Sequence, residues 1–118
     1  MSKGPLIISW VLAVLLGAMF LAAGAGKFGE DAGPMFAAWG YAPWFAVFVG
    51  ACEVLGGIGL LVPRTTRLAV MGLTPIMLGA AYTHVANGEG MDILRPIVFL
   101  VLLWVLWWLR RPRGAVSA

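Results

Sequence analysis

Residues 44–62 have the sequence WFAVFVGACEVLGGIGLLV, in which Glu53 is the only acidic or basic residue. An apolar run of about 20 residues has the length of a helix that crosses a membrane. A charged group near the middle of such a helix costs roughly 2.5–3.5 kcal/mol on insertion scales, so it usually faces protein or water and often has a function. This stretch therefore predicts a membrane-spanning helix with a polar site near its centre.

Three further apolar runs accompany this stretch. Of the 118 residues, 62% are hydrophobic and 11% are charged, whereas a soluble domain carries about 25% charged residues. Backbone groups in lipid have to be hydrogen-bonded within their own segment, so each run predicts a helix, and short connections make neighbouring helices antiparallel. The predicted fold is all-α, a transmembrane four-helix up-down bundle that forms a single domain over residues 1–118. The expected spans are residues 5–26, 44–62, 67–86 and 93–109.

Residues 28–43, FGEDAGPMFAAWGYAP, are too few and too polar to cross a membrane. Two interpretations fit them equally well. The apolar residues Met35, Phe36 and Trp39 could place a short helix at the membrane interface. The segment could also be a plain surface loop.

The charges lie at the ends of the apolar runs, which is the membrane pattern and argues against a nucleic-acid partner despite the net charge of +3. Four spans put both termini and the connection after the second span on one side, which carries many basic residues and no acid. The positive-inside rule then predicts a multi-pass protein of a bacterial-type cytoplasmic (inner) membrane, with both termini cytoplasmic and the lipid bilayer as its main partner. The basic side carries Lys3, Arg64, Arg67, Arg110, Arg111 and Arg113; the other side carries Glu30, Asp31, Glu89 and Asp92 with Lys27 and Arg95.

Small residues indicate which helix faces pack, because they let helices approach closely in lipid. On the second span Glu53 shares a stripe with small residues, so we expect it on the packed face. The fourth span has no small residue, and we expect it to face lipid, another membrane subunit or a second copy of the chain. The expected stripes are Ala46, Gly50, Glu53 and Gly57 on the second span, Ala18, Ala22 and Gly26 on the first, and Gly72, Gly79 and Ala80 on the third.

Four polar residues form the candidate ligand site: Glu53, Lys27, His84 and Arg95. The last three lie at the ends of three different spans on the side opposite the termini, so we expect them to meet in a pocket with Glu53 at its floor. Interface anchoring for the two cations, a local hydrogen bond for His84 and a packing role for Glu53 are the plainer alternatives. No catalytic residue and no metal site are predicted, since one histidine and the single Cys52 offer no ligand pattern.

Several of these residues carry a family resemblance. The second span and the turn after it contain G-x-x-E-x-x-G-G-x-x-L-L followed by T-R, residues 50–67; Gly24 and Lys27 form a G-x-x-K, and His84 ends the third span. Over roughly residues 14–109 the chain resembles the DoxX and DoxX-like family of small four-helix membrane proteins. The resemblance implies the four-helix fold. The family is named for a small subunit of a thiosulfate:quinone oxidoreductase; relatives accompany membrane redox systems, and more distant ones act as receptor-assembly chaperones.

Two functions remain open on these grounds, and the sequence does not decide whether the protein is an enzyme. The first is an accessory subunit of a membrane redox system that binds a quinone, the one possible cofactor, or a similar lipid near the four candidate residues. Carboxylate and imidazole suit a quinone because its reduction requires protons. The second is a structural or assembly subunit of a larger membrane complex, docked through the Trp-rich fourth span. A proton-coupled small transporter fits less well, since the first span contains no glutamate.

Overall fold

Four long helices make up most of residues 3–111, the part of the chain that this computed structural model describes. All four are long and apolar enough to cross a membrane, and no strand occurs within the described residues. The predicted all-α fold with four spans is therefore confirmed, and the helix ends differ from the expected span limits by no more than two residues. The elements are α1 (Lys3–Gly26), α2 (Ala32–Ala38), α3 (Trp44–Leu61), η1 (Pro63–Thr65), α4 (Thr66–Ala86), η2 (Gly90–Ile93) and α5 (Leu94–Arg110).

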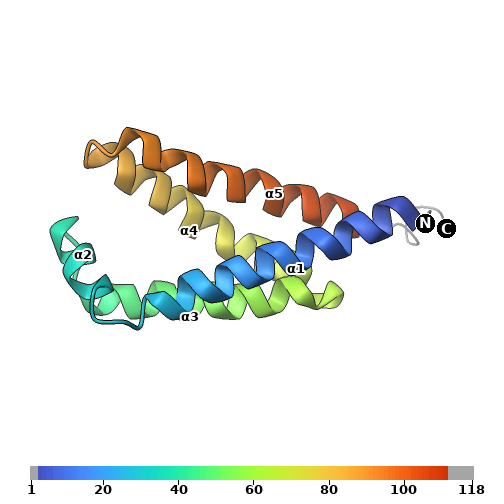
Figure 1. Ribbon diagram of the computed structural model, residues 1–118, viewed down its shortest axis with the longest axis horizontal. Helices are drawn as coiled ribbons and strands as arrows, with labels where there is room; N and C mark the ends of the chain where they lie inside the picture. Colours follow the sequence, from blue (N-terminus) through green and yellow to red (C-terminus); the bar gives the residue numbers. More distant parts are fainter. Residues whose placement is uncertain (1–2, 112–118) are drawn as a thin grey trace.

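The long helices form two antiparallel pairs (Figure 1). α1 packs along α3 over the most extensive interface, and α4 packs along α5; contacts of α3 with α4 and of α1 with α5 close the ring. The two pairs are close together where α1 begins and α5 ends, and they diverge toward the end that carries α2. The bundle measures 51 × 25 × 21 Å.

The apolar core lies between the two pairs. Phe20 of α1 stands against Phe99 of α5, with ring centroids 5.5 Å apart. All four long helices contribute fully buried side chains to this core, and the contacts between these side chains hold the two helix pairs together. The largest of these side chains are Phe20, Leu16, Leu60, Leu73, Leu103 and Leu106.

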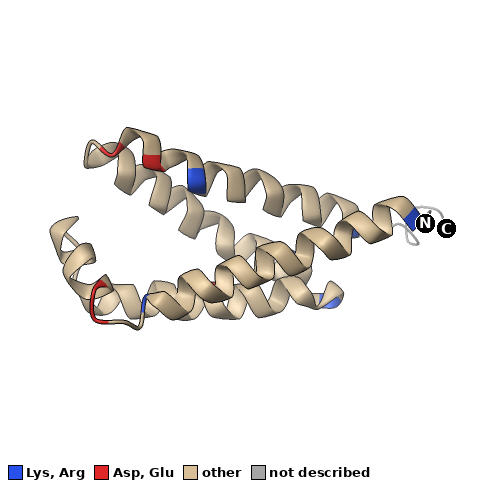
Figure 2. Cartoon of the chain, in the orientation of Figure 1, with Lys and Arg blue, Asp and Glu red and all other residues tan. Residues whose placement is uncertain are grey.

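The two ends of the bundle differ in charge (Figure 2). Among the described residues, the end where α1 begins carries Lys3, Arg64, Arg67, Arg110 and Arg111 and no acid; we call it the basic end. The opposite, acidic end carries Glu30, Asp31, Glu89 and Asp92 with Lys27 and Arg95. Arg113 lies outside the described residues.

Glycines set the distance between α1 and α3. A β-carbon added at Gly24 would lie 2.6 Å from the carbonyl oxygen of Gly50, and one at Gly57 would lie 2.9 Å from that of Gly17. Both distances are too short for real contacts, so the two backbones can touch only because these positions lack side chains. The stripe expected on the second span, which includes Gly50 and Gly57, is buried as predicted.

The stripes expected on the first and third spans are wrong. Ala18, Ala22 and Gly26 are exposed, because α1 turns the neighbouring stripe of Gly17 and Gly24 toward α3. The first span offers two parallel rows of small residues, and only the row with glycines at both contact points allows the backbones to meet. On α4 the glycines expected in the stripe are also exposed, and the buried face is made of larger side chains. The exposed glycines of α4 are Gly72 and Gly79, and its buried residues include Val70, Leu73 and Met77.

The segment between the first two spans contains a short helix, α2, so residues 28–43 are not a plain surface loop. Its buried residues, Ala32 and Phe36, pack with Ala46 of α3. Aromatic side chains surround Phe36, since Trp39, Tyr41 and Phe45 have ring centroids 5.4, 6.0 and 6.0 Å from it. α2 thereby covers the start of α3.

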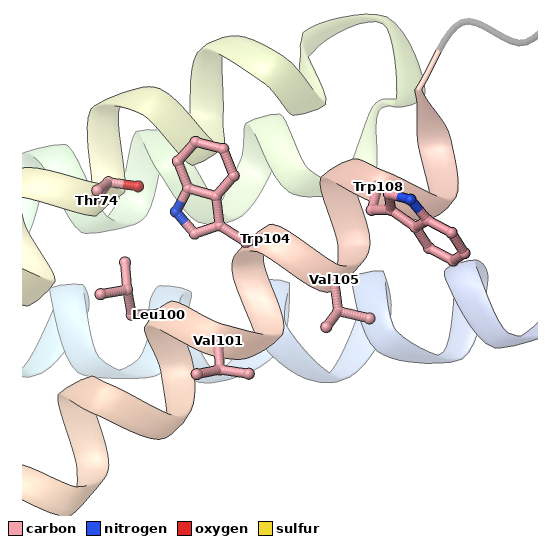
Figure 3. A pocket seen from close by; sticks show the side chains of 6 residues that line it. All are labelled: Thr74, Leu100, Val101, Trp104, Val105 and Trp108. Atoms are coloured by element: carbon pink, nitrogen blue, oxygen red, sulfur yellow. The ribbon is translucent and has the colours of Figure 1, made fainter.

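α5 has the smallest buried share of the four spans, in line with the expectation that it faces lipid or a partner. Its surface next to α4 forms an apolar groove (Figure 3). Thr74 contributes the α4 side of this groove. The α5 side consists of Leu100, Val101, Trp104, Val105 and Trp108.

Candidate functional site

Glu53 is buried within the bundle and is paired with Lys27. Only 3% of Glu53 is exposed, and one of its carboxylate oxygens, Oε1, lies 2.5 Å from the Lys27 ammonium. Lys27 directly follows the last residue of α1, and its side chain is 22% exposed. The ion pair therefore joins α1 to α3 inside the bundle and reaches the surface through the lysine.

Gly50 makes this pair possible. It lies one turn before Glu53 on the same face of α3, and a β-carbon added there would lie 2.8 Å from the β-carbon of Lys27. The stem of the lysine thus occupies the space that a side chain at position 50 would fill. The sequence G-x-x-E therefore combines an open position for the lysine with the carboxylate that its ammonium meets.

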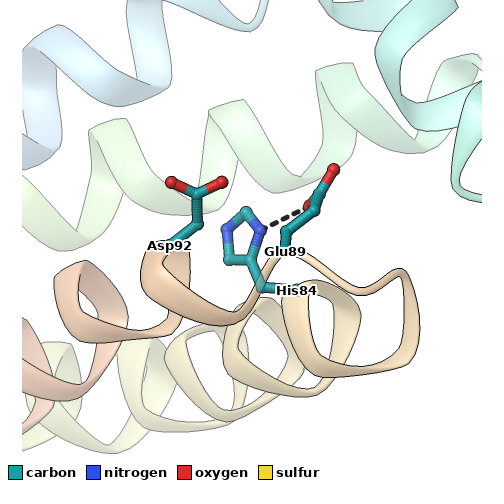
Figure 4. Close-up of side chains that lie close together, drawn as sticks. All are labelled: His84, Glu89 and Asp92. Carbon is teal, nitrogen blue, oxygen red and sulfur yellow. Dashed lines mark hydrogen bonds and ion pairs between the residues drawn. The ribbon is translucent and has the colours of Figure 1, made fainter.

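His84 is paired with Glu89 rather than with the other candidates (Figure 4). Its Nδ1 lies 2.7 Å from Oε1 of Glu89, while Trp39 donates from Nε1 to the other carboxylate oxygen at 3.2 Å. The hydrogen bond from His84, and after it the one from Trp39, holds the pKa of Glu89 below its usual value. Trp39 also stands edge-on to the imidazole at 5.6 Å. This cluster connects the segment after α2 to the end of α4.

A second link between these segments runs through Tyr41 and Thr83, whose hydroxyl oxygens are 2.8 Å apart. The Thr83 hydroxyl donates to the carbonyl oxygen of Gly79 at 2.8 Å, so the proton between the two hydroxyls comes from Tyr41. At the acidic end, the diverging helix pairs are thus linked by the hydrogen bonds of Trp39 and Tyr41.

Asp92 extends the His84 cluster into a set of potential metal ligands. One ligand atom from each of His84, Glu89 and Asp92 lies within 4.8 Å of the others. This grouping was not predicted as a metal site, because it depends on the turn after α4, where Gly88 has a φ of 71°. Asp92 is exposed, and the His84–Glu89 pair accounts for the position of the imidazole without an ion.

Arg95 stands apart from the other three candidates. It is exposed, and its side chain makes no hydrogen bond or ion pair with another described residue. Within residues 3–111, no hydrogen bond or ion pair joins the Lys27–Glu53 pair to the His84–Glu89 pair. The structure thus arranges the candidates as two separate pairs and one unpartnered arginine.

Comparison with known proteins identifies the family. The sequence profile of the DoxX-like family matches residues 11–106, which is most of the chain. The chain belongs to the DoxX-like family. It is also 32% identical over 72 residues to the uncharacterized protein YwoB of Bacillus subtilis (strain 168), a match that covers 61% of this chain and 47% of that protein. The chain thus spans about half the length of this curated relative. No solved structure matches it.

Family membership and four apolar spans make this DoxX-like chain an integral membrane protein in contact with the lipid bilayer. All four candidate residues lie within the matched region. The candidate residues are therefore part of the region that matches the family, although family membership alone does not assign an activity.

Arg110 is a further polar residue of this DoxX-like bundle, and sequence reasoning counted it only as a basic-end charge. Its Nη1 donates to the carbonyl oxygen of Leu60 at 2.6 Å and to the Thr66 hydroxyl at 3.0 Å, and its guanidinium stands 4.6 Å from the ring centroid of Trp10. It thereby ties the end of α5 to α3, α4 and α1. Its spacing in the sequence could have indicated this role, because Arg110 continues the buried stripe of Leu103 and Leu106 on α5.

Proposed function

We propose that this DoxX-like protein is an accessory subunit of a membrane redox system and holds a quinone or similar lipid-like ligand at the acidic end of the bundle. The observation that carries the proposal is the Lys27–Glu53 ion pair, whose carboxylate is buried within α3, one of the candidate membrane spans. Ionisable groups at such positions are costly and usually belong to a functional site.

The chemistry of the acidic end suits a quinone head group. The Lys27 side chain is partly exposed, and its ammonium can donate a hydrogen bond to a carbonyl oxygen of the ligand. Reduction of a quinone needs protons, which a carboxylate–ammonium pair and an imidazole–carboxylate pair can hold and pass on. The aromatic residues around Phe36 offer flat surfaces against which the ring of such a ligand can stack.

The test is purification of the full chain from bacterial membranes in mild detergent, followed by extraction and mass spectrometry of bound quinones. The expected result is a quinone retained by the wild-type protein and largely lost from Glu53→Gln, which removes the charge but keeps the shape. Glu30→Gln is the matched control, because Glu30 is an exposed acid at the same end. Equal quinone content in wild type and Glu53→Gln, with unchanged helical circular dichroism, would contradict the proposal.

The second candidate function is a structural or assembly subunit of a larger membrane complex, with docking through α5. The observation in its favour is that α5 is the least buried span and exposes Trp104, which is 46% accessible. The same purification separates the two functions. A stoichiometric partner protein, released by Trp104→Ala and retained by Glu53→Gln, would support the assembly role.

We also propose that both termini face the cytoplasm of a bacterial-type inner membrane, because the basic end carries no acid among the described residues. In a Cys52→Ser background, Glu30→Cys is expected to react with a membrane-impermeant maleimide in intact cells, whereas Arg64→Cys should react only after the cells are opened. The reverse labelling pattern would overturn this orientation.

A further inference from the structure

A hollow of about 430 Å³ lies at the basic end, between the start of α4 and the end of α5. This volume falls within the roughly 300–1,000 Å³ typical of small-ligand sites. Four arginines contribute to its lining, and no acidic residue among residues 3–111 lies at this end to balance them. We propose that this hollow binds the phosphate of an anionic membrane phospholipid.

The arginines retain free donors for such a phosphate. Arg64 and Arg67 are exposed, and neither makes a side-chain hydrogen bond or ion pair within the described part of the chain. Arg110 uses Nη1 to hold Leu60 and Thr66, whereas its Nη2 is buried and has no hydrogen-bond partner. A buried donor without a partner is costly, and an anion in the hollow would satisfy it.

Electrostatics favours the same occupant. Like charges that share one hollow repel each other, and an anion between them converts that repulsion into attraction. Guanidinium groups present several N–H donors in a plane, which matches the oxygens of a phosphate. The site therefore favours a phosphate-containing head group with a net negative charge over a zwitterionic or neutral one.

The location of the hollow points to a lipid. Its arginines stand where the third candidate span begins and the fourth ends, which is the level of lipid head groups. The apolar groove of Figure 3 runs along the same two helices toward the middle of the bundle. Trp104 of the groove contacts Trp107 of the hollow, with ring centroids 5.9 Å apart, so the two surfaces adjoin. A phospholipid can place its head group among the arginines and an acyl chain in the groove.

This site is distinct from the ligand site proposed at the acidic end, and its test does not depend on that proposal. The full chain in detergent is mixed with equal amounts of phosphatidylglycerol and phosphatidylcholine that carry the same acyl chains. Native mass spectrometry then counts each lipid on the protein. We expect the wild type to retain phosphatidylglycerol preferentially, and Arg64→Gln and Arg67→Gln each to lower that preference by about fivefold.

The matched control is Arg95→Gln, which removes one unpartnered, exposed arginine from the acidic end and should keep the wild-type preference. Inorganic phosphate is the second arm and should not displace the lipid, because it cannot fill the apolar groove. An unchanged preference in both basic-end variants, an equal loss in Arg95→Gln, or full displacement by inorganic phosphate would each overturn the proposal.

Discussion

Replacing Lys27 by methionine is expected to lower the free energy of unfolding by about 3–5 kcal/mol. The substitution keeps the stem of the side chain but leaves the Glu53 carboxylate, only 3% exposed, without its cation. Glu53→Gln should cost much less, because the lysine that remains is 22% exposed and can turn its ammonium toward water. Unfolding of the purified protein in detergent, followed by circular dichroism, measures both effects.

The double variant separates the ion pair from ordinary packing. Lys27→Met combined with Glu53→Gln leaves no buried charge, so it should recover most of the stability lost in Lys27→Met. If the stability losses of the two substitutions add up in the double variant, or if Glu53→Gln costs as much as Lys27→Met, the ion pair does not stabilise the contact between α1 and α3.

Introducing a methyl group at Gly24 is expected to destabilise the bundle by about 1–3 kcal/mol, because the added carbon would force the backbones of α1 and α3 apart. In Gly24→Ala that carbon would lie 2.6 Å from the Gly50 carbonyl oxygen, an atom of the backbone that cannot rotate away. Thermal unfolding in detergent gives the size of the effect.

Gly72→Ala and Gly79→Ala provide matched controls on α4, where an added β-carbon would meet nothing within 4 Å. These two should be neutral or slightly stabilising, since alanine favours helix more than glycine does. Equal losses in Gly24→Ala and in the controls would show that the close approach of α1 and α3 does not account for the change.

The sequence predicted the burial of Glu53, but it did not predict how all the charged candidate residues pair. Glu53 is buried on the packed face, as its stripe of small residues predicted, and Lys27 meets it. His84 instead meets Glu89, a loop acid outside the four candidate residues. Glu89 reaches the imidazole because the chain turns back after α4, where the Glu89 amide donates to the His84 carbonyl at 2.8 Å. A turn of this kind leaves no hydrophobic periodicity from which its contacts could be inferred.

The sequence by itself determined the four spans, their order and the burial of Glu53, because length, apolarity and the face of a helix are properties of short stretches of chain. The tertiary structure alone decided which row of small residues on α1 meets α3, which partner each charged group finds, and that Arg110 ties the end of α5 to the other three long helices. These features depend on how each helix is rotated about its own axis relative to its neighbours. That rotation is set by the closest backbone contacts, here glycine against glycine, between residues far apart in the chain.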